Sequence, residues 1–310
     1  MGGEKWQSEF IHCPSRLCKN PKMGRTVVRE LGNGLREYRC HSCQKSFFFN
    51  IRLRRMYRWH PKFSTFKYMI FENGVYSGLN PKDCDFIVVR GGDGTMLLAV
   101  YALAKYHKPF CGVNLGHLGF LLNSPNEFSL EKLRGEDYEL FSAPLLEATI
   151  LTEDGRKVRE LALNDIIIRE DSGQSALLEV RINGVLLDAG MFGDGLIIST
   201  PLGSTAYTTN AGGVPAIPTL PIFELTPVAP RPRNRIQLVV PETSIISVKA
   251  LELPKRKVKV NQGSIFQHRD VAEVEVRLAT ERAELVFFKP ANVSWDDFSL
   301  ERFREKVYQA

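Results

Sequence analysis

The sequence predicts an α/β domain and then a mostly antiparallel β domain, with a small zinc-ribbon-like module in front of both. Three observations support this order. Four of the six cysteines lie within residues 1–60. In residues 61–141, strand-like apolar runs alternate with a helical segment, which is typical of a parallel sheet. In residues 142–289, short apolar runs separated by turn residues follow one another, which is typical of a β domain. We expect the C-terminal segment 290–310 to complete the α/β domain.

Length, composition and charge limit the possible classes. The chain has 310 residues, 44% of them apolar, which is enough for one large or two ordinary domains. It has no run of about 18 apolar residues, so we expect no membrane span and a cytoplasmic protein. Residues 1–60 carry 13 Lys and Arg against 4 Asp and Glu, whereas the rest of the chain carries 28 against 31. The basic excess therefore lies entirely in the front module.

Two cysteine pairs in this module predict a structural zinc site. Cys13 and Cys18 are separated by four residues, Cys40 and Cys43 by two, and a hairpin-like segment lies between the pairs. Four thiolates from two such pairs give tetrahedral Zn²⁺ coordination. A module with few large apolar side chains also needs such a metal site to stabilise its fold. The alternative is four thiols without a ligand.

The end of this module is basic and aromatic. Residues 38–47 resemble the second knuckle of zinc ribbons from nucleic-acid-associated proteins, and residues 47–59 interleave Phe, Tyr and Trp with arginines. Such a run can grip a phosphate backbone and stack on bases. The alternative is a linker whose aromatic side chains pack the module onto the next domain.

A glycine-rich turn organises the α/β part. The buried strand predicted over Phe86–Val89 leads into Arg90-Gly91-Gly92-Asp93-Gly94-Thr95, and a mostly buried helix is expected over 96–104. Backbone N–H groups of a strand-to-helix turn can approach a phosphate, where the helix dipole favours negative charge. Asp93 suits such a site if it holds Mg²⁺ or accepts a proton from a hydroxyl. The alternative is a tight turn with Asp as a helix cap.

A second polar segment follows the next predicted strand, over 109–113. It contains Asn114 and Phe120, and since ligands of such sheets bind at the carboxyl ends of strands, both residues could line the same cleft as Asp93. The alternative is that Asn114 is a turn residue and Phe120 a core residue.

The second half reads as strands, with a hairpin turn at Asn183-Gly184. We expect strands over 146–151, 161–169, 177–182, 185–188, 236–240, 245–250, 257–260, 271–278 and 284–288. Two polar clusters interrupt them. Asn164 and Asp165 could hold a ribose or a base edge. The turn at Gly203-Ser204-Thr205 presents backbone donors and hydroxyl groups, and we expect a short helix to begin there.

Taken in order, these motifs resemble the NAD kinase family, over roughly residues 67–305. The first motif alone is shared with diacylglycerol and sphingosine kinases, whereas the last is more specific. The motifs are Gly91-Gly92-Asp93-Gly94-Thr95, Asn114-Leu115-Gly116-His117-Leu118-Gly119-Phe120, Leu163-Asn164-Asp165, and Asp194-Gly195-Leu196 with Thr200-Pro201-Leu202-Gly203-Ser204-Thr205-Ala206-Tyr207.

The resemblance implies a fold and a reaction. It implies the two-domain NAD-kinase-like fold and phosphorylation of the adenosine ribose 2′-hydroxyl of NAD to give NADP, with ATP and Mg²⁺ or another phosphoryl donor. Asp93 would be the catalytic base or its Mg²⁺-linked equivalent. The residues that would contact the nucleotides are Gly92, Gly94, Thr95, Asn114, Phe120, Asn164, Asp165, Asp194, Ser204, Thr205, Ala206, Tyr207 and Asn210. A homodimer or homotetramer is implied as well.

Several positions depart from the family pattern. Leu202 stands where Thr is usual, Asn210 where Ser is usual, and Val214 where Pro is usual. Asn261-Gln262-Gly263 replaces a common Asp-Gly-Gln, and Arg90 is an unexpected cation beside the phosphate turn. These departures leave open the phosphoryl donor and the choice between NAD and NADH. The alternatives to an NAD kinase are a lipid kinase of the same superfamily and a nucleic-acid-binding NAD(H) sensor without turnover.

Overall fold

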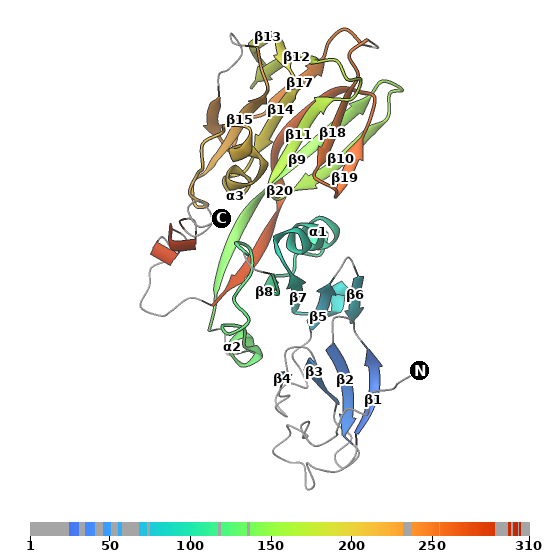
Figure 1. Ribbon diagram of the computed structural model, residues 1–310, viewed down its shortest axis with the longest axis vertical. Coiled ribbons are helices and arrows are strands. Elements are labelled where there is room, and N and C mark those ends of the chain that lie inside the picture. The colour runs from blue at the N-terminus through green and yellow to red at the C-terminus, as the bar shows by residue number, and fades with distance from the viewer. Residues whose placement is uncertain are drawn as a thin grey trace.

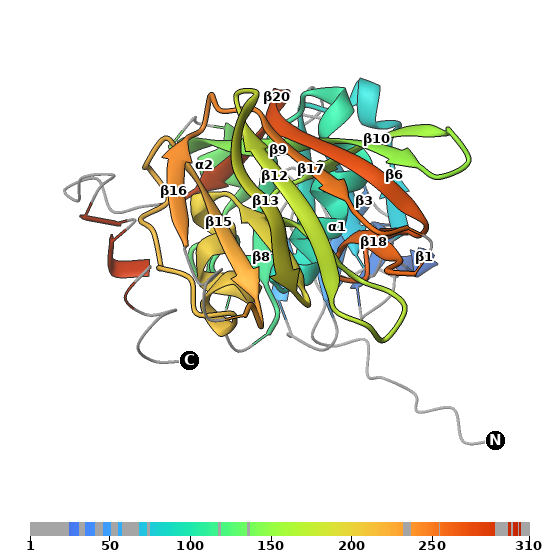
Figure 2. The same cartoon turned by 90° about the horizontal axis from the view of Figure 1, so that it is seen from above.

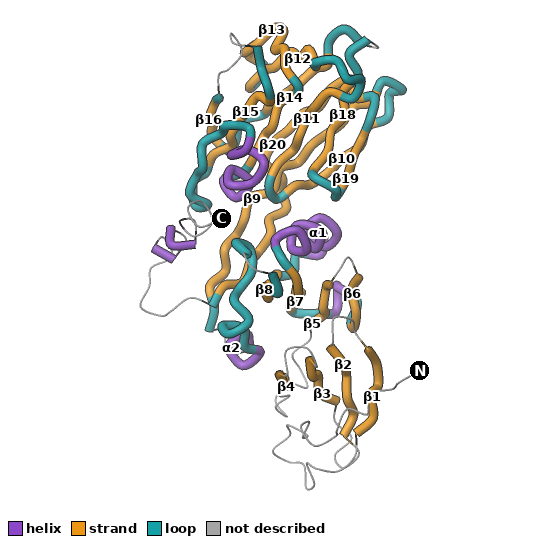
Figure 3. The backbone as a smooth tube through the Cα atoms, viewed as in Figure 1, coloured by secondary structure: helices purple, strands orange, loops and turns teal. Residues whose placement is uncertain are grey.

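The fold is described from a computed structural model. It describes residues 25–30, 35–40, 46–50, 55–57, 68–72, 75–116, 119–134, 137–231, 237–253, 255–288, 297–298, 300–302 and 304. The strands and helices of the described part are shown in Figure 1 and Figure 3. No helix in the described residues is both long and apolar enough to cross a membrane.

A ten-stranded mixed sheet runs through the molecule. Its path is β13-β12-β17-β20-β8-β7-β5-β6, with β9 on β20 and β10 on β9. Strands β5, β7 and β8 are parallel, and the end of β20 adds to β8 in the same direction. The strands are β5 (Tyr68–Glu72), β6 (Val75–Gly78), β7 (Phe86–Gly91), β8 (Phe110–Asn114), β9 (Glu139–Thr152), β10 (Lys157–Ala162), β12 (Ala176–Ile182), β13 (Val185–Gly193), β17 (Ile246–Ala250) and β20 (Val271–Phe287).

The parallel part is buried on both faces, as the apolar run at 86–89 predicts. Ile87 and Val89 pack with helix α1 (Asp93–Leu103), whose buried residues include Met96 and Val100. Phe86 packs on the other face, toward helix α2 (Leu130–Arg134). Short 3-10 helices complete this region, η3 (Pro81–Asp83) before β7 and η4 (Ala104–Tyr106) after α1.

A six-stranded antiparallel sheet packs on the antiparallel half of the large sheet. Its order is β16-β15-β14-β11-β18-β19. A core of Val, Ile, Leu and Phe side chains from both sheets fills the space between them. The strands are β11 (Asp165–Glu170), β14 (Gly195–Ser199), β15 (Ile222–Val228), β16 (Leu238–Pro241), β18 (Val258–Gln262) and β19 (Phe266–His268). The α/β plus β fold predicted from the sequence is confirmed.

Strands β9 and β20 join the two halves. They pair antiparallel along almost their whole length, with a register shift between Leu278 and Arg282. Figure 2 shows β20 running across the molecule beside β17 and β9. Strand β9 crosses the expected boundary at 141/142, and β20 pairs with it on both sides of this boundary, so the α/β region and the β-rich region share one continuous sheet.

A separate four-stranded antiparallel sheet lies in the front module, in the order β1-β2-β3-β4. The expected hairpin between the cysteine pairs is present as β1 and β2. Cys40 ends β2, and its side chain is not described; Cys13, Cys18 and Cys43 lie outside the described residues. The strands are β1 (Arg25–Glu30), β2 (Leu35–Cys40), β3 (Ser46–Asn50) and β4 (Arg55–Tyr57).

Three expected elements differ from the structure. The strand predicted over 161–169 is two strands, because the chain bends at Leu163-Asn164 between β10 and β11. The runs 271–278 and 284–288 are one strand, β20. In segment 74–81, where the Gly, Ser, Asn and Pro residues predict turns, residues 75–78 form strand β6, which pairs with β5 as a hairpin.

Candidate active site

The glycine turn lies between β7 and α1, with Asp93 as the first residue of the helix. Gly91 is required because a Cβ there would lie 2.3 Å from the Oγ1 of Thr95. At Gly92 and Gly94, a Cβ would meet no atom within 4 Å. The turn therefore leaves open space at the N-terminus of α1, where a phosphate group can approach backbone N–H groups.

The carboxylate of Asp93 is held by the loop that follows β8. The Phe120 N–H donates to Oδ2 at 3.1 Å, and the Leu121 N–H donates to Oδ1 at 2.9 Å. Both oxygens are thus oriented by backbone donors. Asp93 is fixed in position rather than acting as a side-chain cap, since α1 has no side-chain cap hydrogen bond.

Asn114 lies at the end of β8, opposite Gly91 in the parallel ladder. Its Oδ1 accepts a hydrogen bond from the Gly116 N–H at 3.0 Å. A Cβ at Gly119 would lie 2.7 Å from the Asn114 side chain, so this glycine lets the loop fold over Asn114. Asn114 therefore shapes the loop that holds Asp93.

A cavity of about 290 Å³ opens beside this turn, and we call it the central cavity. Its volume is near the lower end of small-molecule pockets, about 300 Å³. Four segments that are distant in sequence line it, from α1, the start of β11, the turn after α3 and the β18–β19 turn. The lining residues are Gly94, Leu97, Asn164, Asp165, Ile167, Ala206, Tyr207, Gln262, Gly263, Ser264 and Ile265.

Helix α3 (Pro201–Gly203) brings two of these segments together. Thr200 caps it: its hydroxyl accepts from the Gly203 N–H at 3.2 Å and donates to the Leu163 carbonyl at 2.7 Å. A Cβ at Gly203 would lie 2.0 Å from the carbonyl oxygen of Asn164. Only glycine allows this close approach, which places the following π-helical turn η5 (Ser204–Thr208) next to Asn164.

Burial raises the pKa of the Asp165 carboxyl from 3.8 to about 7. Only 5% of this residue is exposed. The charged form is disfavoured because the carboxylate loses its hydration. A perturbed acid at the edge of a cavity is a functional candidate.

The central cavity brings together only some of the residues that the sequence predicts for the site. Gly94, Asn164, Asp165, Ala206 and Tyr207 line it, with Asp93 next to Gly94. The other predicted residues lie outside its lining: Gly92, Thr95, Asn114, Phe120, Asp194, Ser204, Thr205 and Asn210.

Some of these residues have structural contacts. The Ser204 hydroxyl donates to the Pro201 carbonyl at 2.7 Å and accepts from the Ala216 N–H at 2.8 Å. Phe120 is buried and lines a separate, smaller apolar pocket with Leu202. Asp194 and Asn210 are exposed.

Arg90 does not face the phosphate turn as a free cation. It is 4% exposed, and its guanidinium lies 3.2 Å from the carboxylate of the equally buried Glu72. The pairing neutralises much of its charge. Arg90, the unexpected cation beside the phosphate turn, is therefore part of a buried ion pair.

Sequence reasoning missed one wall of the cavity, formed by Gln262, Gly263, Ser264 and Ile265. The sequence marks Asn261-Gln262-Gly263 as a turn that departs in detail from the family pattern, and it does not place this turn at the site. The signal was the turn itself, since Gly263 adopts a φ of 48° between β18 and β19. Gln262 is 3% exposed, and neither its Nε2 nor its Oε1 has a hydrogen-bond partner in the described part of the chain.

No cluster of three or more His, Cys, Asp or Glu side chains within the described residues could hold a metal ion. Asp93 alone still fits Mg²⁺. This ion commonly binds through one or two carboxylates, substrate phosphates and several waters. Its preference for oxygen ligands matches the two carboxylate oxygens of Asp93.

A glycine turn that is open at the N-terminus of α1, an oriented carboxylate and a cavity of about 290 Å³ meet at one place. Together they define a class of protein, a nucleotide-dependent phosphotransferase in which positioning supplies most of the catalysis.

Comparisons with known proteins identify the family. The model described as "ATP-NAD kinase N-terminal domain" matches residues 12–133, and "ATP-NAD kinase C-terminal domain" matches residues 163–286. The first match begins well before the start near residue 67 that the motifs indicate. An NAD kinase from Xylella fastidiosa (strain Temecula1 / ATCC 700964) is 34% identical over 221 residues, which are 69% of this chain and 82% of that protein. One from Brucella suis biovar 1 (strain 1330) is 35% identical over 234 residues, 74% and 89% of the two chains.

Two solved structures of NAD(H) kinases have folds similar to this chain. Yeast NADH kinase complexed with NADH has a TM-score of 0.61 and 25% identity, over 74% of this chain and 69% of that one. An NAD kinase from Archaeoglobus fulgidus in complex with ATP has a TM-score of 0.58 and 29% identity, over 74% and 85%. The chain belongs to the NAD kinase family, the kinases that phosphorylate NAD to NADP with ATP.

Proposed function

We propose that Asp93 and the central cavity carry out the NAD kinase reaction in this chain. The cavity would receive the adenosine end of NAD, with its ribose 2′-hydroxyl toward Asp93, and ATP would approach the glycine turn. One observation carries this proposal: Gly94, the neighbour of Asp93, lines the same cavity as Asn164 and Asp165. The acceptor nucleoside and the phosphate turn are therefore within reach of each other.

Asp93 would act on the acceptor hydroxyl. Its carboxylate is oriented by two backbone N–H groups, so it can take the hydroxyl proton or hold the metal without first reorganising. Bound Mg²⁺ would neutralise charge on the phosphates. The open faces of Gly92 and Gly94 would let the donor approach the N–H groups at the start of α1.

Asn164 and Asp165 would hold the ribose hydroxyls of NAD. An amide both donates and accepts, and a carboxylate accepts, so together they match a sugar diol. Ala206 and Tyr207 would close the opposite side of the cavity, placed there by α3 and Gly203. The remaining predicted contacts, including Thr95, Thr205 and Asp194, are part of the same proposal.

The test is NADP formation from NAD, ATP and Mg²⁺, measured with an NADP-specific dehydrogenase. Asp93→Asn should lower kcat by about 10² to 10⁴, while the Kd for NAD changes little. Asp83→Asn is the matched control, because Asp83 is exposed in η3 and should leave activity unchanged. Full activity in Asp93→Asn would remove the proposal.

NADH is a second candidate acceptor, since one structurally similar protein is a yeast NADH kinase complexed with NADH. The same assay with NADH in place of NAD decides between them. A higher kcat/KM for NADH would reverse the assignment of the preferred acceptor.

The localisation, the oligomeric state and the metal content of the protein remain predictions. We propose a cytoplasmic homodimer or homotetramer, Mg²⁺ as the metal that accompanies ATP, and a structural Zn²⁺ in the front module. Nucleic-acid binding through residues 1–60 rests on the basic charge of this module. Salt-dependent binding of DNA or RNA at low ionic strength would support it.

A further inference from the structure

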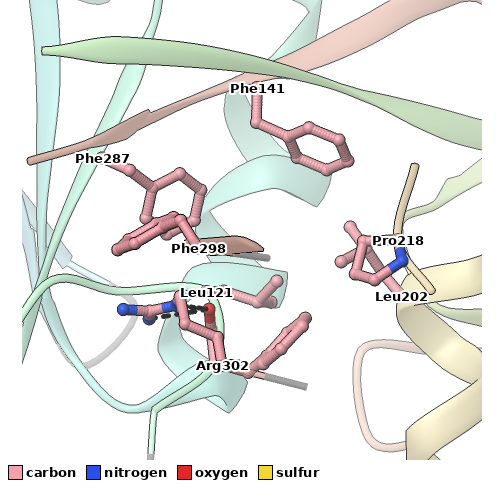
Figure 4. Close-up of a pocket in the computed structure, with 8 residues that line it drawn as sticks. Leu121, Phe141, Leu202, Pro218, Phe287, Phe298 and Arg302 are labelled. Atoms are coloured by element: carbon pink, nitrogen blue, oxygen red, sulfur yellow. Dashed lines mark hydrogen bonds between the residues drawn. The ribbon is translucent and has the colours of Figure 1, made fainter. Parts of the chain in front are cut away.

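The last described residues of the chain return to the loop that holds Asp93. Residues 297–298 and 300–302 are helical, and Phe298 packs in the core of the α/β region. Arg302 and Phe298 line a small pocket of about 20 Å³ together with Phe120 and Leu121. Figure 4 shows Phe287 and Phe298 on one side of this pocket, with Arg302 beside them.

The guanidinium of Arg302 forms hydrogen bonds with the backbone of this loop. It donates to the carbonyl oxygens of Gly119 at 3.0 Å and Phe120 at 2.9 Å, and also to that of Leu122. Its Nε donates to the Phe120 carbonyl as well, at 3.3 Å. The dashed lines in Figure 4 mark hydrogen bonds of Arg302 in this pocket. Three acceptors on one planar guanidinium fix the loop in one orientation.

Aromatic side chains hold the guanidinium in turn. Its centre lies 5.0 Å from the ring centroid of Phe287 and 5.5 Å from that of Phe298. These distances are within the range of cation–π attraction. Strand β20, which carries Phe287, and the C-terminal helix therefore both support Arg302.

The same two peptide groups face Asp93 on their other side. The peptide between Gly119 and Phe120 accepts from Arg302 at its C=O and donates to Asp93 at its N–H. The peptide between Phe120 and Leu121 does the same. Each peptide group thus lies between a cation and an anion. Such chains of hydrogen bonds polarise one another and become stronger together.

We propose that Arg302 is a positioning residue for phosphoryl transfer, which acts on Asp93 through these two peptide groups. Arg302 sets the position of the loop, strengthens the N–H donors and so fixes the carboxylate toward the acceptor hydroxyl. This inference rests on the role proposed above for Asp93. It adds the C-terminal helix to the catalytic apparatus, although Arg302 lies outside the lining of the central cavity.

The test separates kcat from substrate binding. Arg302→Ala should lower kcat at least tenfold, because a small displacement of a reacting group costs up to about 10² in rate. The Kd for NAD should change less than about twofold, since Arg302 lies outside the lining of the central cavity. Guanidinium salt at millimolar concentration should restore part of kcat in Arg302→Ala and leave the wild type unaffected.

Two further variants complete the design. Arg304→Ala is the matched control, because Arg304 is exposed two residues further along and should keep wild-type kcat. Arg302→Lys keeps the charge but loses the planar fork, so its kcat should lie between those of Arg302→Ala and the wild type. If Arg302→Ala does not fold, Arg302→Lys carries the test through the same split between kcat and Kd.

Three results would overturn the inference: wild-type kcat in the folded Arg302 variants, equal losses in kcat and NAD affinity, or no rescue by guanidinium. Asp93→Asn distinguishes this failure from failure of the proposed function. An inactive Asp93→Asn beside a fully active Arg302→Ala rejects only the role of Arg302. A fully active Asp93→Asn rejects both.

Discussion

At the scale of single residues, burial makes ionisation of the Asp165 carboxyl unfavourable, and the effect on the free energy of unfolding can be measured. Burial raises its pKa from 3.8 to about 7. Between about pH 4 and pH 7, the folded protein keeps a proton that the unfolded chain has released, so the free energy of unfolding falls as pH rises through this window. Asp165→Asn, neutral at every pH, should therefore unfold with a free energy up to about 4 kcal/mol higher than the wild type at about pH 8.

Chemical denaturation of the NAD-free protein at several pH values tests this prediction. The difference between the two proteins should shrink toward zero near pH 4, where Asp165 is protonated in the folded state. The variant should bind NAD more weakly than the wild type, because it loses an acceptor for ribose hydroxyls. A less stable Asp165→Asn protein at about pH 8 would contradict the raised pKa.

Replacing Gln262 should stabilise the folded protein but weaken its interaction with NAD. Its side-chain amide is buried at the central cavity without a hydrogen-bond partner in the described residues, which costs about 1–3 kcal/mol per group. Gln262→Leu removes this cost, so the free energy of unfolding should rise. If NAD supplies the missing partner, the same change should raise the KM for NAD about tenfold, the equivalent of about 1.4 kcal/mol.

The matched control for this prediction is Gln267→Leu, since Gln267 is exposed on β19 five residues further along. It should change neither stability nor KM. A Gln262→Leu protein with unchanged KM would show that the amide does not contact the substrate.

At the scale of elements, local sequence predicts what local forces determine. The run Phe86–Val89 and the helix after Asp93 follow from apolar patterning and a glycine turn, and both are present as β7 and α1. The hairpin at Asn183-Gly184 is also present, with φ of 51° and 81° at the two residues. Positive φ at both central positions is what this dipeptide permits.

The break between β10 and β11 could not be predicted in this way. Leu161 to Arg169 is apolar on both sides of Asn164-Asp165, and this polar pair alone does not distinguish a bend from a continuous strand. The bend depends on α3, whose cap Thr200 binds the Leu163 carbonyl and whose Gly203 packs on Asn164. These partners are more than thirty residues away in sequence. This long-range contact places Asn164 and Asp165 at the cavity, so the missed bend is also part of the candidate site.

At the scale of the whole molecule, β9 and β20 fix the site. Asp93 belongs to the α/β region and Asp165 to the β-rich region, and the two long strands run through both. Figure 1 shows α1 between the parallel strands and the β-rich part. The sequence indicated five of the residues that line the central cavity, because motifs mark them: Gly94, Asn164, Asp165, Ala206 and Tyr207. It did not indicate the 262–265 wall or the Arg302 contact, because both depend on contacts between segments that are distant in sequence.

For the front module, the prediction of a zinc site rests on the sequence. Its sheet β1–β4 is antiparallel, and β2 ends at Cys40, one of the four predicted zinc ligands. We expect about one Zn²⁺ per purified chain, because four thiolates complete its tetrahedral coordination. Changing Cys40 and Cys43 to Ser should abolish the bound metal and lower the stability of the module, since metal binding contributes directly to folding.

Metal analysis of the two proteins, with Cys84→Ser as the control, decides the question. Cys84 is a free, buried thiol in the α/β region, so its loss should leave the zinc content unchanged. NADP formation measured on the same samples shows whether the module serves catalysis. An active, folded wild-type protein without zinc would reject the zinc site and leave residues 1–60 as a basic module held by its own sheet.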